Sequence, residues 1–416
     1  MTRRRLAIAL VALLALAGAG AGAAWWWNER ETRDVRGSAG TEFAGTEEPG
    51  TTRREREIRE EPWPTYGFDA ARTRFAPDFA HRPPYRKLWT LRVGELIEFP
   101  PVVAYGRLYF ATFRGRFFAV EGETGKIAWK KNFRRFTAAS PTVGSGVVYQ
   151  PLMNARGENR DTAPGFLVAL DAKSGRKLWR FRAGVIESSP LLVDGVLYFG
   201  TFDNKLYALD ARTHEVRWTY RTGDDVKGGP VLAGRTIYFG SYDGNVYAVD
   251  ARTGKLRWRS GAQGGLRGAG NFYATPAVAY GRVFIGNTDG KVYAFGARTG
   301  RLRWSRSTGG YVYSSAAVWN KTVYVGSYDR RLYALDAATG DVRWSFKAND
   351  RISGAPTVLA GLVYFATLAR RTYALDARTG KRVWSFPDGK YTPVVADAER
   401  VYLTGYKRLY GLEPTG

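Results

Sequence analysis

Apolar and polar residues alternate in short runs that recur along the whole chain. Residues 246–258, VYAVDARTGKLRW, show the pattern most fully: an alternating run, an Asp, Thr-Gly, and a second run that ends in Trp. Alternation predicts strands with one buried face, and Thr-Gly predicts the turn between them, because glycine adopts positive φ without a steric penalty. The Asp can accept hydrogen bonds from the turn amides. The pattern therefore predicts strand, tight turn, strand.

Relatives of this segment share the Thr-Gly turn or its variant and the final Trp, and they lie at residues 117–129, 166–179, 206–218, 292–304, 332–344 and 372–384, with a truncated copy at 409–416. Their tryptophans, together with an earlier Trp89, are spaced 39 to 50 residues apart. Between tryptophans the chain has a short apolar run after a Pro, a turn, and a second run such as VLYFGT at 196–201. Four short strands per unit of this length predict the blades of a β-propeller.

The two ends of the repeat region predict how the ring closes. The last unit supplies three strands and stops, whereas the strand KLWTLRV at 87–93 has no partner strands before it. If that strand completes the last unit, the array closes into eight blades and leaves no exposed sheet edge. An open β-solenoid is the structural alternative, and it would not need the unpartnered strand.

The N-terminus has the pattern of a membrane anchor. Residues 1–5 contain three arginines, and residues 6–27 carry no charge, which is long enough for a transmembrane helix with its N-terminus in the cytoplasm. The alternative is a cleaved signal peptide with Ala21-Gly22-Ala23 as the cleavage site. Residues 28–61 are poor in large apolar side chains and are predicted to be a disordered linker. Both alternatives place a single all-β domain, 62–416, outside the cytoplasm.

Composition narrows the possible functions. The 416 residues include no Cys, which excludes disulfides, thiolate metal sites and a lipidated cysteine anchor. Residues 1–61 are electrically balanced, so the net charge of +25 lies entirely on residues 62–416. A field of this sign favours anionic partners, although an arginine-rich surface without a specific ligand gives the same number. Nucleic acid would suit the charge but not the predicted compartment.

The candidate binding residues lie where the repeat is interrupted. Insertions at 153–165 and 261–273 fall in connections that share one face of a propeller, at the mouth of its channel. We predict that this mouth face binds acidic peptides, proteins or anionic polymers through basic and aromatic side chains. They are Arg114, Arg116, Arg134, Arg135, Arg267, Phe272, Tyr273, Arg330, Arg331, Arg351, Arg370 and Arg371.

The repeat A-x-D-x-x-T-G-x-x-x-W resembles the tryptophan-docking motif of propellers with pyrroloquinoline-quinone (PQQ) repeats. The segment from Trp63 to Pro77, with Tyr66, Asp69 and Arg74, looks like the one that precedes the first blade of quinoprotein alcohol dehydrogenases. This resemblance implies the eight-bladed fold. It leaves function open, because the family includes PQQ-dependent dehydrogenases and BamB-type outer-membrane assembly proteins.

In the dehydrogenases, an acid in the second blade and an Asn in a later turn hold the calcium ion beside PQQ. The resemblance points to Glu158 and Asn287 for these roles, although an exposed loop acid and a turn residue would look the same. The adjacent-cysteine disulfide of many such enzymes is impossible here. We therefore favour a non-catalytic, monomeric binding or scaffold module without a cofactor over a PQQ and calcium enzyme or a BamB-like assembly factor.

Overall fold

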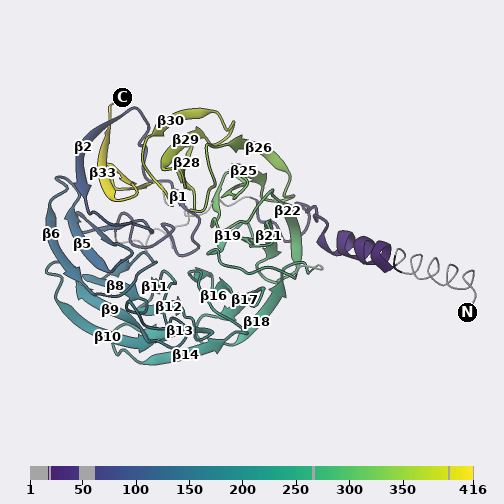
Figure 1. Cartoon of the computed structure of the whole chain (residues 1–416), viewed down its shortest axis with the longest axis horizontal. Helices are drawn as coiled ribbons and strands as arrows, with labels where there is room; N and C mark the ends of the chain where they lie inside the picture. Colours follow the sequence, from purple (N-terminus) through teal and green to yellow (C-terminus); the bar gives the residue numbers. More distant parts are fainter. Residues whose placement is uncertain (1–16, 18–19, 46–60, 265–267, 392–393, 416) are drawn as a thin grey trace, which may run out of the picture.

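The computed structural model describes residues 17, 20–45, 61–264, 268–391 and 394–415. Strands of this part of the chain form eight sheets around one axis, as Figure 1 shows. Each sheet is one blade, in which successive strands run antiparallel from the axis to the rim. The predicted all-β, eight-bladed propeller is confirmed.

The innermost strands of blades 1 to 8 are β3 (Val102–Ala104), β7 (Thr142–Gly144), β11 (Leu191–Val193), β15 (Val231–Ala233), β19 (Ala277–Ala279), β23 (Ala317–Trp319), β27 (Thr357–Leu359) and β31 (Val394–Ala396). The second strands are β4 (Arg107–Ala111), β8 (Val147–Leu152), β12 (Val196–Gly200), β16 (Thr236–Gly240), β20 (Arg282–Gly286), β24 (Thr322–Gly326), β28 (Leu362–Thr367) and β32 (Val401–Thr404). The third are β5 (Arg116–Glu121), β9 (Gly165–Asp171), β13 (Lys205–Asp210), β17 (Asn245–Asp250), β21 (Lys291–Gly296), β25 (Arg331–Asp336), β29 (Arg371–Asp376) and β33 (Arg408–Pro414). The outermost are β6 (Ile127–Asn132), β10 (Lys177–Ala183), β14 (Val216–Arg221), β18 (Leu256–Gly261), β22 (Leu302–Ser307), β26 (Val342–Lys347), β30 (Arg382–Phe386) and β2 (Tyr85–Arg92).

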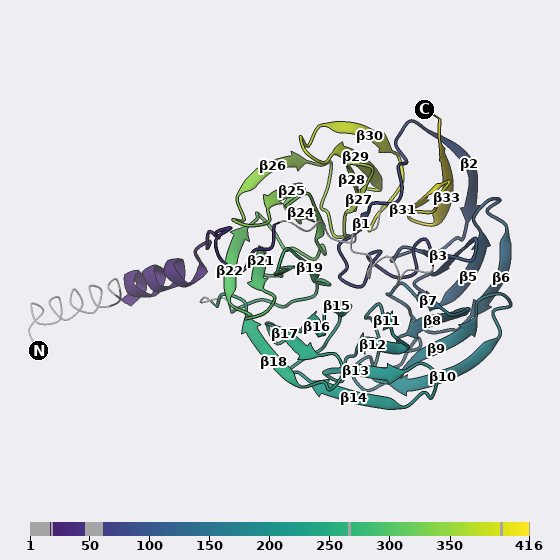
Figure 2. The ribbon, with the colours of Figure 1, turned by 180° about the vertical axis from the view of Figure 1, so that it is seen from behind.

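Blade 8 joins the two ends of the repeat region. Strand β2 pairs antiparallel with the C-terminal β33, with Trp89 opposite Gly411. The early strand therefore supplies the missing rim strand of the last unit, as predicted, and Figure 2 shows it beside β33 from the back of the ring. Because the ring closes, the inner faces of neighbouring blades pack on each other and form the core, for example Tyr324 of blade 6 with Phe365 of blade 7.

The repeated Trp joins each blade to the next. The indole N–H of Trp218, for instance, donates to the carbonyl of Ala251 in the following blade at 3.0 Å. The turn glycine of that blade, Gly254, has φ +71° and lies so close to the ring that a Cβ would approach it to 2.7 Å. Asp250 accepts from the turn amides of Arg252 and Thr253, as predicted. The repeat is therefore an inter-blade contact rather than a functional site.

An axial segment, residues 63–76, runs inside the ring and contacts the inner strands in turn. Its short strand β1 (Phe75–Ala76) pairs parallel with β27 of blade 7. The main-chain oxygens that accept from inner-strand amides of blades 1, 2, 4, 5, 6 and 7 belong, in that order, to Trp63, Pro64, Ala70, Ala71, Thr73 and Arg74. One continuous segment thus ties most of the blades together at the axis.

Part of the segment 28–61, which was predicted to be a disordered linker, is ordered against the propeller. Residues 33–44 lie against blades 5 and 6, where backbone groups of Val35 and Gly37 pair with Ser305 and Thr339. Residues 46–60 lie outside the described part of the chain. A helix over 20–32 precedes this contact and leaves the ring at its edge beside β22 (Figure 1).

The predicted membrane span, 6–27, falls largely on residues 1–16 and 18–19, which are outside the described part. Among the residues that are described, none of the helical segments has the length and apolar character needed to cross a membrane. Trp25, Trp26 and Trp27, which we expected at the membrane interface, lie on the helix and are exposed.

Candidate functional site

The connections predicted to share the mouth face do lie together. The loop that enters blade 2 pairs with that blade's insertion, since Phe136 N–H donates to Asn154 O at 3.0 Å and Met153 N–H to Phe136 O at 2.8 Å. In blade 6, Tyr328 N–H donates to Tyr311 O at 3.0 Å in the equivalent way. Each β-turn between second and third strands thus contacts the loop from the rim to an inner strand.

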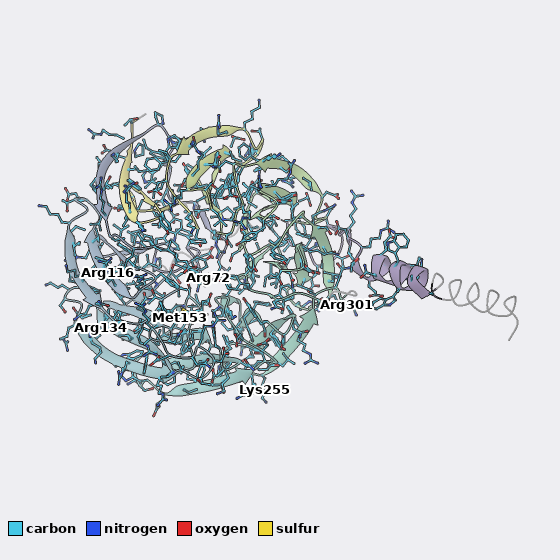
Figure 3. All side chains as sticks on the ribbon, in the orientation of Figure 1. Arg72, Arg116, Arg134, Met153, Lys255 and Arg301 are labelled. Carbon is cyan, nitrogen blue, oxygen red and sulfur yellow. The ribbon has the colours of Figure 1, made fainter. Side chains whose placement is uncertain are left out.

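An arginine-rich groove lies on this face between blades 1 and 2. Its cavity measures about 540 Å³, and its walls are Glu95, Phe113, Arg114, Arg116, Asn132, Arg134, Arg135, Phe136 and Arg156. Four of these arginines were predicted for the binding face. Figure 3 labels Arg116 and Arg134 near one another on the side of blade 1. We call this cavity the arginine groove.

Close backbone approach builds the groove. Phe133 N–H donates to Gly115 O, and Thr137 N–H donates to Phe113 O, at 2.9 and 3.0 Å. A Cβ on Gly115 would collide with the carbonyl oxygen of Arg135, so the position requires glycine. The rings of Phe113 and Phe136 meet with centroids 5.1 Å apart. The groove therefore has a fixed aromatic wall.

The arginines of the groove divide into two groups. Arg116 is held by Glu95 at 3.1 Å, and Arg135 donates to Met153 O at 2.7 Å and to Glu158 at 2.9 Å. Arg114, Arg134 and Arg156 are exposed, and in the described residues their guanidinium groups have no partner. Those three groups are therefore available to a ligand. An anionic ligand suits them, because the five N–H donors of each guanidinium match carboxylate or phosphate oxygens.

A second basic cluster surrounds Tyr406 on blades 7 and 8. The Arg370 guanidinium lies 3.9 Å from the ring centroid, and the ammonium groups of Lys390 and Lys407 lie 4.9 and 5.3 Å from it. On blade 6, Arg351 lies 5.4 Å from the ring of Tyr328. The rings hold cations at the mouth, and Arg351 also lies 3.9 Å from the carboxylate of Asp350.

The remaining residues predicted for the binding face differ from one another in exposure. Arg330 is exposed, while Arg331 donates to Ser345 and Arg371 is half-buried within its blade. Phe272 was predicted to lie on the binding face, but it is fully buried and packs on Tyr293 in the core. Arg267 lies outside the described residues. The Phe272 side chain fills the space between blades 4 and 5, because an apolar ring is more stable in the core than in water.

A small pocket of about 70 Å³ lies near the axis and is lined in part by Tyr66 of the axial segment. We call it the axial pocket. Side chains that line it come from most of the blades and include Glu98, Phe99, Glu187, Ser189, Lys227, Tyr273, Thr275, Tyr313, Ser315, Ser353 and Tyr391. Sequence reasoning did not find Glu98 or Glu187. A signal was present, because six of these residues stand three positions before the residue that immediately precedes the inner strand, which is Pro in most repeats.

The two glutamates of the axial pocket are electrostatically coupled. Burial raises the pKa of Glu98 to about 7, and the neighbouring Glu187 adds to this effect while Lys390 opposes it. Burial also raises the pKa of Glu187, against a hydrogen bond of 2.8 Å from Tyr273 and the charge of Lys227. Lys227 itself lies 3.3 Å from Asp225 and 3.7 Å from the centroid of Tyr242.

Glu98→Gln is expected to stabilise the protein at pH 8. A carboxyl whose folded pKa is about 7, above the ordinary 4.5, holds its proton longer in the folded state. Stability therefore falls as pH rises from about 4.5 to about 7, and the amide removes this loss, a gain of about 1–3 kcal/mol at pH 8. Below pH 4.5 the difference should vanish. Thermal unfolding at several pH values measures it, with exposed Glu123→Gln as control; an equal shift at pH 4 and pH 8 would contradict the assignment.

Glu158 and Asn287 do not form a common site. The Glu158 carboxylate accepts from Arg135 and from Ala155 N–H, whereas Asn287 is fully buried in blade 5 with its oxygen bound to Asp289 N–H at 2.8 Å. Neither lines the axial pocket, and that cavity is well below the roughly 300–1,000 Å³ typical of cofactor sites. In the described residues no three His, Asp or Glu side chains are grouped to hold a metal. The residues present thus do not fit PQQ with calcium.

A family model described as outer membrane protein assembly factor BamB matches residues 85–163, 160–312 and 306–415. The chain belongs to this family of PQQ-repeat propellers. BamB of Burkholderia pseudomallei is 28% identical over 139 residues, which are 33% of this chain and 34% of that protein. The quinohemoprotein alcohol dehydrogenase ADH IIB of Pseudomonas putida is 33% identical over 115 residues, 24% of this chain and 15% of the enzyme. The matched region therefore spans about a third of the BamB relative's length and less of the enzyme's.

Solved structures with the same fold include both kinds of relative. BamB from Moraxella catarrhalis has a TM-score of 0.64 at 19% identity and covers 79% of this chain and 99% of its own. The quinohemoprotein alcohol dehydrogenase from Comamonas testosteroni has a TM-score of 0.70 at 15% identity, over 86% of this chain and 81% of its own. At these identities the likeness concerns the fold, which BamB-family propellers share with the enzymes.

Proposed function

We propose that this BamB-family propeller is a non-catalytic binding module, anchored in the membrane by its N-terminus, that holds an acidic segment of a partner protein at its mouth face. The observation that carries the proposal is the arginine groove, in which three guanidinium groups have no partner among the described residues. Its neighbouring aromatic wall and the fixed loops around it provide a preformed surface. Such a surface binds without an ordering cost for its own backbone.

The charge and shape of the groove favour an extended acidic ligand. Arg114, Arg134 and Arg156 come from three separate segments that line one groove, so a ligand that extends along the groove can contact all three. Carboxylates spaced along a peptide can do so, and the phenylalanine rings can accept apolar side chains between them. The relatives named as outer-membrane assembly factors support a protein partner. The uncharged run at 6–27 supports the anchor and a position outside the cytoplasm.

Charge reversal in the groove is expected to weaken binding of an acidic peptide at least tenfold. The probe is a fluorescent polyglutamate peptide, titrated into the full-length chain, with Arg114→Glu and Arg134→Glu combined in one variant. Losing two charge-assisted contacts corresponds to about 1.4 kcal/mol or more. The matched control reverses Arg221 and Arg259, which are exposed on rim strands β14 and β18, so that net charge changes equally.

Equal weakening by the groove variant and the rim variant would contradict the proposal, because it would show that net charge alone attracts the peptide. Polyphosphate serves as the second probe. If it binds more tightly than polyglutamate and shows the same dependence on the groove, the ligand is an anionic envelope polymer instead of a protein. A groove-specific loss for polyglutamate, with weaker polyphosphate binding, supports the protein partner.

A further inference from the structure

One acidic position of the repeat is missing in blade 5. At the end of the third strand, most full copies carry Asp or Glu, as in Asp210 and Asp250, but blade 5 has Gly296. In blade 3, Asp210 accepts from the amides of Arg212 and Thr213 at 2.9 and 2.8 Å and from Arg217 at 2.7 Å. Blade 5 retains the same donors, since its turn also has an Arg-Thr pair and an arginine after it.

Glu42 of the N-terminal segment supplies the missing carboxylate. Its Oε1 accepts from the amides of Arg298 and Thr299 at 3.0 and 3.1 Å, and its Oε2 accepts from the Thr299 hydroxyl at 2.7 Å and from Arg303. These are the donors that an Asp at 296 would satisfy. A Cβ on Gly296 would collide with Oε2 of Glu42, so the foreign carboxylate occupies the space of the absent side chain.

The contact is buried and charge-assisted. The side chains of Glu42 and Arg303 are 10% and 15% exposed. The hydrogen bonds from Thr299, Arg303 and Arg298 hold the pKa of Glu42 below its ordinary value, although burial acts in the opposite direction. A carboxylate that is this well paired favours the bound state of its segment.

Contacts on both sides of Glu42 extend the interaction over blades 5 and 6. Arg282 donates to Ser38 O and Thr41 O at 2.7 and 3.1 Å, and Phe43 packs on Tyr280 with ring centroids 5.6 Å apart. Toward the helix, Arg36 pairs with Asp341 at 2.7 Å. The segment 33–44 therefore follows one continuous surface.

We propose that the rims of blades 5 and 6 form a docking site for the chain's own N-terminal segment, with Glu42 as the specificity residue that takes the place of the missing Asp of the fifth repeat. The helix over 20–32 leads directly into this segment and extends away from the edge of the ring in Figures 1 and 2. Docking thus fixes how the propeller, and with it the mouth face, is oriented toward whatever holds the N-terminus. Docking of this segment is independent of what the mouth face binds.

The test restores the missing side chain. Gly296 does not have positive φ, so Gly296→Asp fits the backbone, and the new carboxylate should satisfy the turn and expel Glu42. We expect amide hydrogen exchange of residues 34–44 in the full-length chain to become at least about tenfold faster. Glu42→Ala should accelerate it similarly. The two variants should differ in thermal stability, because Glu42→Ala leaves the donors of blade 5 unpaired whereas Gly296→Asp pairs them.

Glu31→Ala, in the exposed part of the helix, is the control and should leave exchange of 34–44 unchanged. Unchanged exchange of 34–44 in either Glu42→Ala or Gly296→Asp would overturn the proposal. An equal loss of melting temperature in both variants would also overturn it, since it would show that the carboxylate at 296 cannot replace Glu42. The combined variant should keep the stability of Gly296→Asp with the segment released.

Discussion

Replacing Arg72 with methionine is expected to lower the free energy of unfolding by about 3–5 kcal/mol, because it removes the shared donor of several buried oxygens. Arg72 is fully buried near the axis, where Figure 3 labels it. Its guanidinium donates to the carbonyls of Ser189 and Pro190 at 3.1 and 3.0 Å, and to Thr65 and Tyr66. Methionine conserves the apolar stem but leaves these oxygens unpaired, each at a cost of about 1–3 kcal/mol.

The position of Arg72 makes the effect global. The guanidinium joins the axial segment to blade 3, while neighbouring backbone oxygens of that segment hold blades 4 to 7. Denaturant unfolding monitored by tryptophan fluorescence measures the loss, with exposed Arg221→Met as the control. A loss below about 1 kcal/mol for Arg72→Met would show that water replaces the missing donors and that the axial segment does not tie the ring together.

Trp304→Ala is expected to cost about 3–5 kcal/mol, the range for a fully buried aromatic side chain. Trp304 has no exposed surface, packs against Phe284 with ring centroids 5.8 Å apart, and donates to Ala337 O at 3.0 Å. Gly340 of the next blade lies beneath the ring, and Gly37 of the N-terminal segment covers its edge. The variant therefore loses packing between blades and part of the docking surface.

Trp218 provides the matched comparison. It makes the same hydrogen bond to the next blade, to Ala251 O at 3.0 Å, but it is half-buried and is not covered by residues 33–44. Trp218→Ala should therefore cost less than Trp304→Ala in the same unfolding experiment. If the two variants lose equal stability, the N-terminal segment adds nothing to the packing of Trp304, and the docking surface is narrower than the contacts indicate.

The repeat made the fold predictable. The Trp, the Thr-Gly turn and the Asp recur because every blade must contact the next, so their spacing predicted the blade count, and the unpartnered strand around Trp89 predicted closure through β33. The shared position of second-strand turns and rim-to-axis loops is also a consequence of the repeat. It placed Arg114, Arg116, Arg134 and Arg135 on one face before their groove was visible.

The predictions that differed from the structure concern residues whose partners are distant in sequence. Composition predicted a disordered linker because residues 28–61 cannot form a core alone. In the structure, however, Glu42 and Phe43 contact residues of blade 5. Gly296 was the signal, a break in the repeat that needs an acid from elsewhere. The two axial glutamates were not predicted, because most repeats have another residue at this position. Glu98 and Glu187 come together only when the ring is closed.

Hydrogen exchange of the full-length chain with and without bound polyglutamate tests the central claim most directly, because it locates the ligand without altering any residue. Binding at the arginine groove predicts slower exchange of amides in residues 112–116, 132–137 and 153–158, and unchanged exchange in rim strands β14 and β18. Protection confined to the rim strands, or to residues 33–44 and the blades beneath them, would contradict the account of the mouth face as the binding surface.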